Sequence, residues 1–200
     1  ICSDKTGTLT QNKMKVSDIL KRAGVYLSLS ETESLPTLSE TDARAQTECN
    51  TLLFCLNEVL SELATDYFPQ IIEEEYQLVS GKINFDELSK SINKLHAVKN
   101  SRNEYLKFTL NCQSATVETG QRKVIVRYSY LPSTLSAYTA DIDFEALAVT
   151  SRLIALGVAT EYCLYKGKLS EANMFDARYR DAIKAALTPA RSLSIKPRTW

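Results

Sequence analysis

Residues 49–64 read CNTLLFCLNEVLSELA and carry the clearest helical pattern in the chain. Their apolar side chains recur every three or four residues, a spacing that places them on one face of an α-helix. The face consists of Cys49, Leu52, Leu53, Leu56, Val59, Leu60 and Leu63. A stripe of this length must be covered by other parts of the chain. We therefore expect a helix that begins at residue 39 or 41, ends near residue 64 and packs into a helical core.

A second long helix is predicted over residues 143–165, where Phe144, Leu147, Ile154, Val158 and Tyr162 mark an apolar stripe. Small residues in the same segment would let a neighbouring helix approach closely: Ala146, Ala148, Ala155, Gly157 and Ala159. Only this segment and residues 52–63 carry long apolar stripes, so we expect the two helices to pack against each other.

Two further helices are indicated by their capping residues. Ser17 and Asp18 can cap a short helix that Gly24 would end. Ser170 can cap another, which runs to about residue 187 and is stopped by Pro189.

Between the helices lies a strand-like region. Residues 123–131, KVIVRYSYL, alternate in period two, with Val124, Val126, Tyr128 and Tyr130 on one face. Residues 73–79 and 104–112 are also strand-like, and a turn is expected at residues 118–121. The predicted fold class is therefore α+β: a bundle of long helices with a small antiparallel sheet inserted at about residues 71–131, and with extended termini. We expect one domain over residues 14–190.

Composition excludes several classes of function. The 24 basic residues balance the 24 acidic ones, which argues against binding to nucleic acid or a membrane surface through net charge. No stretch approaches the roughly 20 apolar residues of a membrane span. The five cysteines are scattered without a CxxC pair, a pattern typical of buried free thiols in a reducing compartment.

The opening residues 1–16, ICSDKTGTLTQNKMKV, resemble the phosphorylation loop of P-type ATPases. The resemblance implies that Asp4 attacks the γ-phosphate of ATP while Thr6 holds phosphoryl oxygens. Only three residues precede Asp4, too few for the buried strand that the family's loop follows, and its GDGxND magnesium segment has no counterpart. We expect residues 1–13 to be a foreign or disordered leader. An enzyme fragment that is phosphorylated at Asp4 is the alternative.

Other catalytic signals are sparse. His96 is the single histidine, and the run Glu73-Glu74-Glu75 indicates a solvated face, because consecutive side chains point in different directions. The sequence therefore predicts no enzyme, no cofactor and no metal site.

From residue 14 onward the layout resembles tailed-phage head-to-tail connectors, also called neck adaptors. The similarity rests on residues 55–69 (CLNEVLSELATDYFP), residues 126–132 (VRYSYLP) and the helix pair of residues 152–187, which a basic tail ending in PRTW follows. The resemblance implies a structural virion protein that forms a homo-oligomeric ring between the portal protein and the tail or a second neck protein. DNA would only pass through its channel, no membrane would be involved, and the protein would reside in the virion neck after assembly in the host cytoplasm. A non-catalytic host interaction domain of the same build is a further alternative.

Residues 191–200 are predicted to form an extended docking arm. Tryptophan and arginine are enriched at interface hot spots, and the arm is too short to fold alone. The alternative is a tail packed on its own domain. The candidate partner-binding residues are Arg191, Lys196, Pro197, Arg198 and Trp200.

Overall fold

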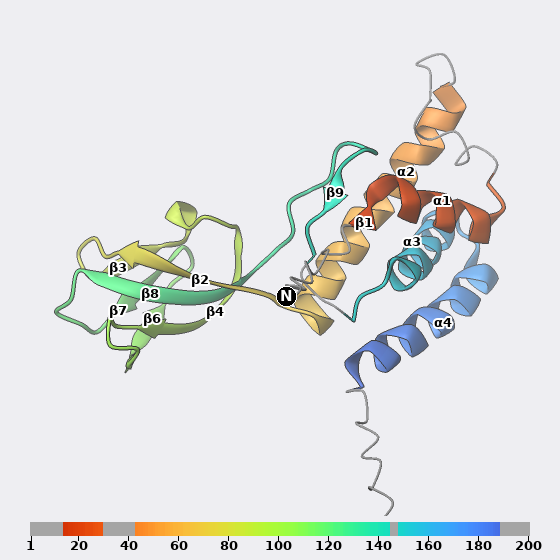
Figure 1. Cartoon of the computed structure of the whole chain (residues 1–200). Helices are drawn as coiled ribbons and strands as arrows, with labels where there is room; N and C mark the ends of the chain where they lie inside the picture. Colours follow the sequence, from red (N-terminus) through yellow and green to blue (C-terminus); the bar gives the residue numbers. More distant parts are fainter. Residues whose placement is uncertain (1–13, 30–42, 145–147, 189–200) are drawn as a thin grey trace, which may run out of the picture.

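The computed structural model describes residues 14–29, 43–144 and 148–188. They form two lobes, one of helices and one of strands (Figure 1). The chain leaves the helical lobe after its second helix and returns after the last long strand, so the sheets are an insertion between helices. Each lobe has its own hydrophobic core. The predicted α+β fold class is confirmed.

The helical lobe is built around α3 (Ser151–Tyr165). Against it pack α1 (Val16–Leu27), α2 (Ala43–Glu62) and α4 (Leu169–Leu187). Because α3 has neighbours on three sides, every residue from Leu153 to Thr160 is buried. The predicted contact between the two apolar helices is confirmed, with Leu56 of α2 and Val158 of α3 fully buried.

Several predicted helix ends are wrong. The helix expected from residue 143 begins at Ser151, where the hydroxyl of Thr150 accepts a hydrogen bond from the Leu153 amide at 3.3 Å. Helix α1 continues through the buried Gly24 to Leu27, and Ser28 caps it in left-handed geometry with φ of 56°. No side chain caps α4, which begins one residue before Ser170. The expected start of α2 at residue 39 or 41 lies outside the described residues.

A return segment links the sheets back to the bundle. Its strand β9 (Asp141–Ile142) pairs with β1 (Met14–Lys15), so the chain is extended just before residue 143. The Asn57 side chain on α2 fixes the segment through both backbone groups of Leu135: it accepts from the amide at 2.8 Å and donates to the carbonyl at 3.0 Å.

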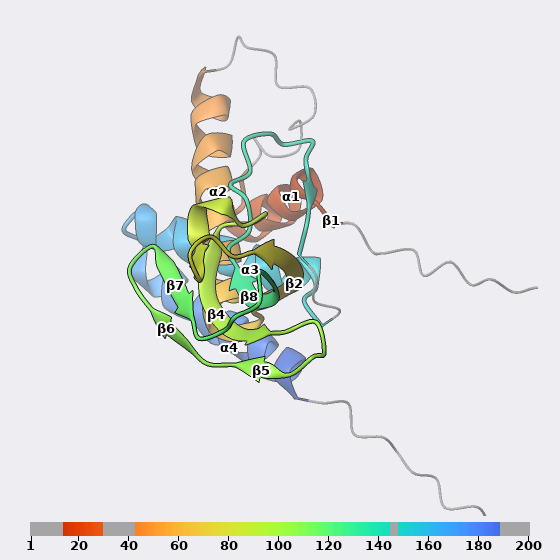
Figure 2. The same cartoon turned by 90° about the vertical axis from the view of Figure 1, so that its left-hand side faces the viewer.

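The sheet lobe contains two small sheets around one core, and all strand pairs among the described residues are antiparallel. The larger sheet has the order β2 (Gln70–Gln77), β8 (Lys123–Tyr130), β4 (Ile92–Lys99) and β5 (Tyr105–Leu106). The smaller has the order β3 (Lys82–Asn84), β7 (Ser114–Val117) and β6 (Phe108–Leu110). The predicted inward face of β8 is confirmed, because Val124, Val126, Tyr128 and Tyr130 are all buried. Figure 2 views this lobe end-on, with β2, β8 and β4 side by side.

Candidate interaction surfaces

The predicted functional residues fall at the two ends of the chain. Asp4 lies in residues 1–13, outside the described part. The same holds for the predicted docking residues, which follow α4: Arg191, Lys196, Pro197, Arg198 and Trp200. Their roles stay predictions. The surfaces considered below are those of the residues that the structure describes.

The residues that the structure describes contain neither a metal-binding cluster nor a membrane-spanning helix. Among residues 14–29, 43–144 and 148–188, no three or more His, Cys, Asp or Glu side chains are grouped to hold a metal ion. None of the described helices combines the length and the apolar character needed to cross a bilayer.

The turn between α3 and α4 exposes a group of large apolar side chains. Tyr165 and Leu169 are each 65% exposed, and Leu164 beside them is 46% exposed. Gly167, with φ of 71°, makes the tight turn that brings the ends of the two helices together. We call Leu164, Tyr165 and Leu169 the α3–α4 surface; it lies at the end of the helical lobe remote from the sheets (Figure 1).

A charged side chain borders this surface. The Lys166 ammonium lies 5.9 Å from the centre of the Tyr165 ring and 5.4 Å from that of Tyr162. It also forms a 3.0 Å ion pair with Glu48 of α2. Exposed apolar groups with a polar rim are typical of protein interfaces, so the arrangement suits docking to another protein.

The outer face of the larger sheet carries charges in register across its strands. Glu73 of β2 lies opposite Arg127 of β8, and its carboxylate is 3.6 Å from that guanidinium and 3.1 Å from the Lys99 ammonium of β4. Glu75 is exposed on the same face. The prediction of a solvated acidic face holds for these two residues.

Glu74 differs from its neighbours, because its half-buried side chain points to the inner face. Its carboxylate accepts hydrogen bonds from the Tyr128 hydroxyl at 3.0 Å and from the Ser89 amide at 3.1 Å. The Tyr128 hydroxyl also accepts from the Lys90 amide at 3.2 Å. Glu74 is therefore a structural residue that ties the loop before β4 to the sheet core.

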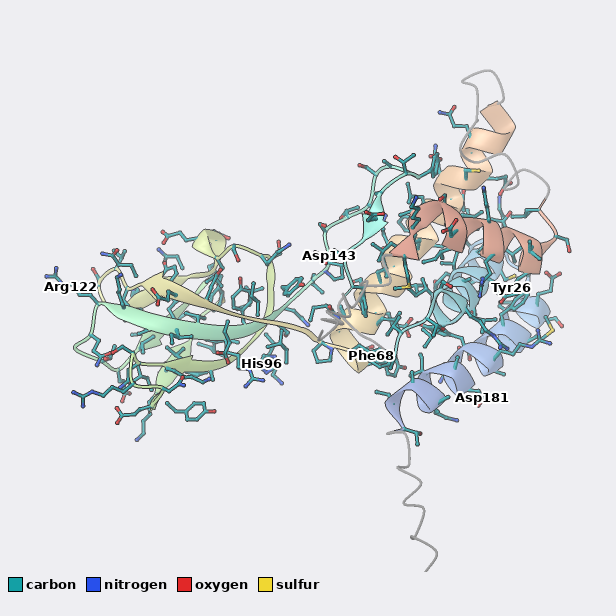
Figure 3. The ribbon with its side chains drawn as sticks, viewed as in Figure 1. Tyr26, Phe68, His96, Arg122, Asp143 and Asp181 are labelled. Atoms are coloured by element: carbon teal, nitrogen blue, oxygen red, sulfur yellow. The ribbon has the colours of Figure 1, made fainter. Side chains whose placement is uncertain are left out.

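His96 lies on β4 near the junction of the lobes (Figure 3). It is the extra residue of a β-bulge, since Leu95 pairs with Tyr128 and Ala97 with Arg127. Partial burial, followed by the charges of Lys94 and Arg127, lowers the pKa of His96. The imidazole is consequently neutral at pH 7.

A cluster of acidic groups lies on the helical lobe. The Tyr179 hydroxyl of α4 donates to the Glu62 carboxylate of α2 at 3.1 Å, and burial, followed by the nearby Glu62, raises the pKa of Tyr179. Burial, followed by the charge of Glu62, raises the pKa of Glu161 on α3. Repulsion between these half-buried acidic groups lowers the stability of the folded protein. Within the described residues they do not form a set of metal ligands.

The pKa of Glu161 predicts a pH-dependent gain from Glu161→Gln. A raised folded-state pKa means that ionisation of Glu161 costs stability as the pH rises through its ordinary pKa and above. The variant should match the parent near pH 3, where the carboxyl is protonated in both states. At pH 7 it should be more stable by roughly 0.6–1.5 kcal/mol, because repulsion of about 0.2–0.5 kcal/mol is relieved with each of its three acidic neighbours, Glu62, Glu58 and Asp176.

Urea unfolding across this pH range tests the prediction, with the exposed Glu118→Gln in the sheet lobe as the control. Equal stability of the Glu161→Gln variant and the parent at pH 7 would contradict it.

Thiol reactivity should follow burial. Cys49, Cys55 and Cys163 are buried, whereas Cys112 is exposed. Burial, followed by the charge of Glu161, raises the pKa of Cys55 to about 12. Among these four cysteines, iodoacetamide at pH 8 should modify Cys112 first and Cys55 at least about a hundredfold more slowly, because the thiolate is the reactive form. Peptide mass spectrometry measures this, and comparable rates in the native protein would refute it; urea should abolish the difference.

One hollow of about 450 Å³ lies at the far end of the sheet lobe, between residues 77–81 and 119–122. Arg122 is its only ionisable residue, so it holds no acid–base pair. It does not contribute to the candidate interaction surfaces.

The α3–α4 surface was missed by sequence reasoning. Its signal was the segment LYKGKL, residues 164–169, in which apolar residues flank a glycine turn. Neither a scan against protein-family models nor a search of curated proteins finds a match to this chain.

Proposed function

We propose that this chain is a structural virion protein, a head-to-tail adaptor that forms a ring joining the portal protein to the tail or a second neck protein. The observation that carries the proposal is the separation of two lobes, each with its own core, along one elongated molecule (Figure 1). Such a molecule offers two well-separated surfaces, as a protein between two partners requires. The α3–α4 surface supports one contact at the outer end of the helical lobe.

Charge and composition support the same function. The net charge of zero suits a protein that is held in place by specific contacts with other proteins. DNA would pass through the ring without being bound by it. In this proposal the protein resides in the virion neck and assembles in the host cytoplasm. Its docking arm, residues 191–200, binds the portal through Trp200 and Arg198.

Truncation of the arm tests the proposal. A chain that lacks residues 197–200 should keep the circular dichroism spectrum and melting temperature of the parent, because the removed residues follow the last helix. In the virus that encodes the protein, it should block the joining of heads to tails, leaving both as separate particles in electron micrographs. Trp200→Phe serves as the conservative comparison and should retain part of the joining. Normal virions from the truncated chain would refute the docking role.

A further inference from the structure

Strand β2 forms one border of the larger sheet and pairs only with β8. Within the described residues, no backbone hydrogen bond is made along the edge of residues 71–77 that faces away from β8. The strand is eight residues long, and Figure 2 shows it at the margin of the lobe. An open edge of this length is a template for one more strand, which would bind through backbone hydrogen bonds.

The side chains of β2 select the chemistry of that strand. Ile71, Glu73 and Glu75 are exposed on its outer face. The carboxylate of Glu73 is neutralised by Lys99 and Arg127, whereas Glu75 makes no ion pair within the described residues. Glu75 therefore offers an uncompensated negative charge to a basic side chain on an added strand.

The same charges disfavour pairing of two β2 strands with each other. An antiparallel pair centred on Glu74 would place Glu73 of each copy opposite Glu75 of the other, and like charges directly opposite are destabilising. The edge is thus protected against self-association and suited to a strand of opposite charge.

This chain contains one segment with that character. Residues 191–196 read RSLSIK, contain two basic residues and no acidic one, and precede Pro197. In an extended conformation Arg191, Leu193 and Ile195 share one face, while Ser192, Ser194 and Lys196 share the other. The first of these faces carries an apolar residue and a basic residue that can lie beside Ile71 and Glu75 of β2.

We propose that residues 191–196 of one copy add to β2 of a neighbouring copy as an antiparallel strand. One register pairs Ile195 with Ile71 and Arg191 with Glu75. It places Leu193 beside Glu73, whose carboxylate is already paired with Lys99 and Arg127. Pro197 then lies opposite Pro69, just before β2 begins, where a residue without an amide hydrogen leaves no hydrogen bond of the strand unmade.

We assign the arm to another copy. Helix α4 ends at Leu187 in the helical lobe, and the four steps from there to Arg191 span at most about 14 Å. Glu75 lies five residues, or about 17 Å, further out along β2 than Gln70. The sheet lobe extends away from the end of α4 (Figure 1), so we assign the arm to the outer part of β2 in a neighbouring copy.

The inference deepens the proposed function and rests on it in one respect, the ring of identical subunits. An arm that binds the next copy makes a head-to-tail contact, and such contacts close into rings when the rotation between subunits permits. Residues 191–196 would hold neighbours together, leaving Pro197–Trp200 for the portal.

Charge exchange in the full chain tests the proposal. Glu75→Arg and Arg191→Glu each place like charges together in the register above. Each should therefore raise the dissociation constant of self-assembly more than about tenfold, since like-charge contacts in an interface cost several kcal/mol. The chain that carries both substitutions should assemble as the parent does. A mixture of the two single variants should also assemble, because each arm then meets an edge of opposite charge.

Mass photometry and sedimentation measure the assembly, starting from the 22.4 kDa monomer. Glu118→Arg, the same charge change at an exposed position of the same lobe, is the matched control and should leave assembly unchanged. Circular dichroism should show that all variants are folded, because Glu75 is exposed.

Several outcomes would overturn the inference: a parent chain that stays monomeric at tens of micromolar, single variants that assemble normally, or a double variant that fails to recover. Recovery by the double variant but not by the mixture would overturn exchange between copies. Portal binding by the parent chain is measured separately. A parent chain that assembles with itself but does not bind the portal would count against the proposed function and not against the arm exchange.

Discussion

Leu56→Ala should lower the free energy of unfolding by about 2–5 kcal/mol, the usual cost of emptying a buried leucine site. Leu56 is completely buried on α2, within the core that α2 forms with α3. Three sides of α3 are already packed, so neighbouring side chains have little room to fill the space. Urea denaturation measures the loss, which should appear as a lower midpoint with an unchanged slope.

Phe54→Ala provides the matched control for Leu56→Ala. It lies two residues earlier on the same helix, but its side chain is 56% exposed. Its cost should be well below that of Leu56→Ala, because little packing is lost. A cost below about 1 kcal/mol for Leu56→Ala would refute the packing of α2 into the core.

Gly157→Ala should also destabilise the protein, although alanine is the better helix former. A Cβ atom on Gly157 would lie 2.8 Å from Val59 Cγ1 of α2 and 2.9 Å from Tyr179 Cε2 of α4. Overpacking costs about 1–3 kcal/mol, and the helix propensity of alanine returns about 1 kcal/mol at most. Val59 is stiff at χ1 and Tyr179 is held by its hydrogen bond to Glu62, so neither side chain can move away freely. We expect a net loss of up to about 2 kcal/mol.

A double-mutant cycle tests the cause of that loss. Val59→Ala removes one of the two clashing atoms, so Gly157→Ala should cost less in that background than in the parent. Gly120→Ala is the control, since a Cβ there has no atom within 4 Å. A stabilising effect of Gly157→Ala in the parent would show that α2, α3 and α4 do not meet at this residue.

The elements that the sequence predicts well are those whose side chains follow one period throughout. The stripe on α2 and the alternation on β8 identify both elements and their buried faces. The small residues of α3 indicate close packing, and Gly157 has this role. Such patterns persist because one side of each element faces a single core.

Strand β4 was missed although it pairs with the best-predicted strand. Its register with β8 shifts twice, between Ile92 and Lys94 and between Leu95 and Ala97. Each extra residue reverses the alternation, so the eight residues INKLHAVK show no period of two. Hydrogen bonding to β8 holds β4 in the sheet although its sequence lacks the alternating pattern. Such pairing cannot be recognised from the residues of β4 alone.

The same limit applies to the return segment and to the candidate surfaces. Residues 143–150 have helical composition, but the β1–β9 pair and the Asn57 contacts with Leu135 keep the preceding segment extended. The open edge of β2 depends on strand order, which the residues of β2 alone do not specify. By contrast, the basic charge of the arm that we assign to that edge can be read directly from its residues.

The ring adaptor function is tested most directly by the mass of the complex between the full chain and the portal protein of the same virus. Native mass spectrometry or mass photometry should show the portal ring gaining an integral number of 22.4 kDa subunits that approaches one per portal subunit. Electron microscopy of that complex should place these subunits as a ring on the tail-facing end of the portal. A portal mass that stays unchanged in the presence of tens of micromolar chain would contradict the function proposed for this protein.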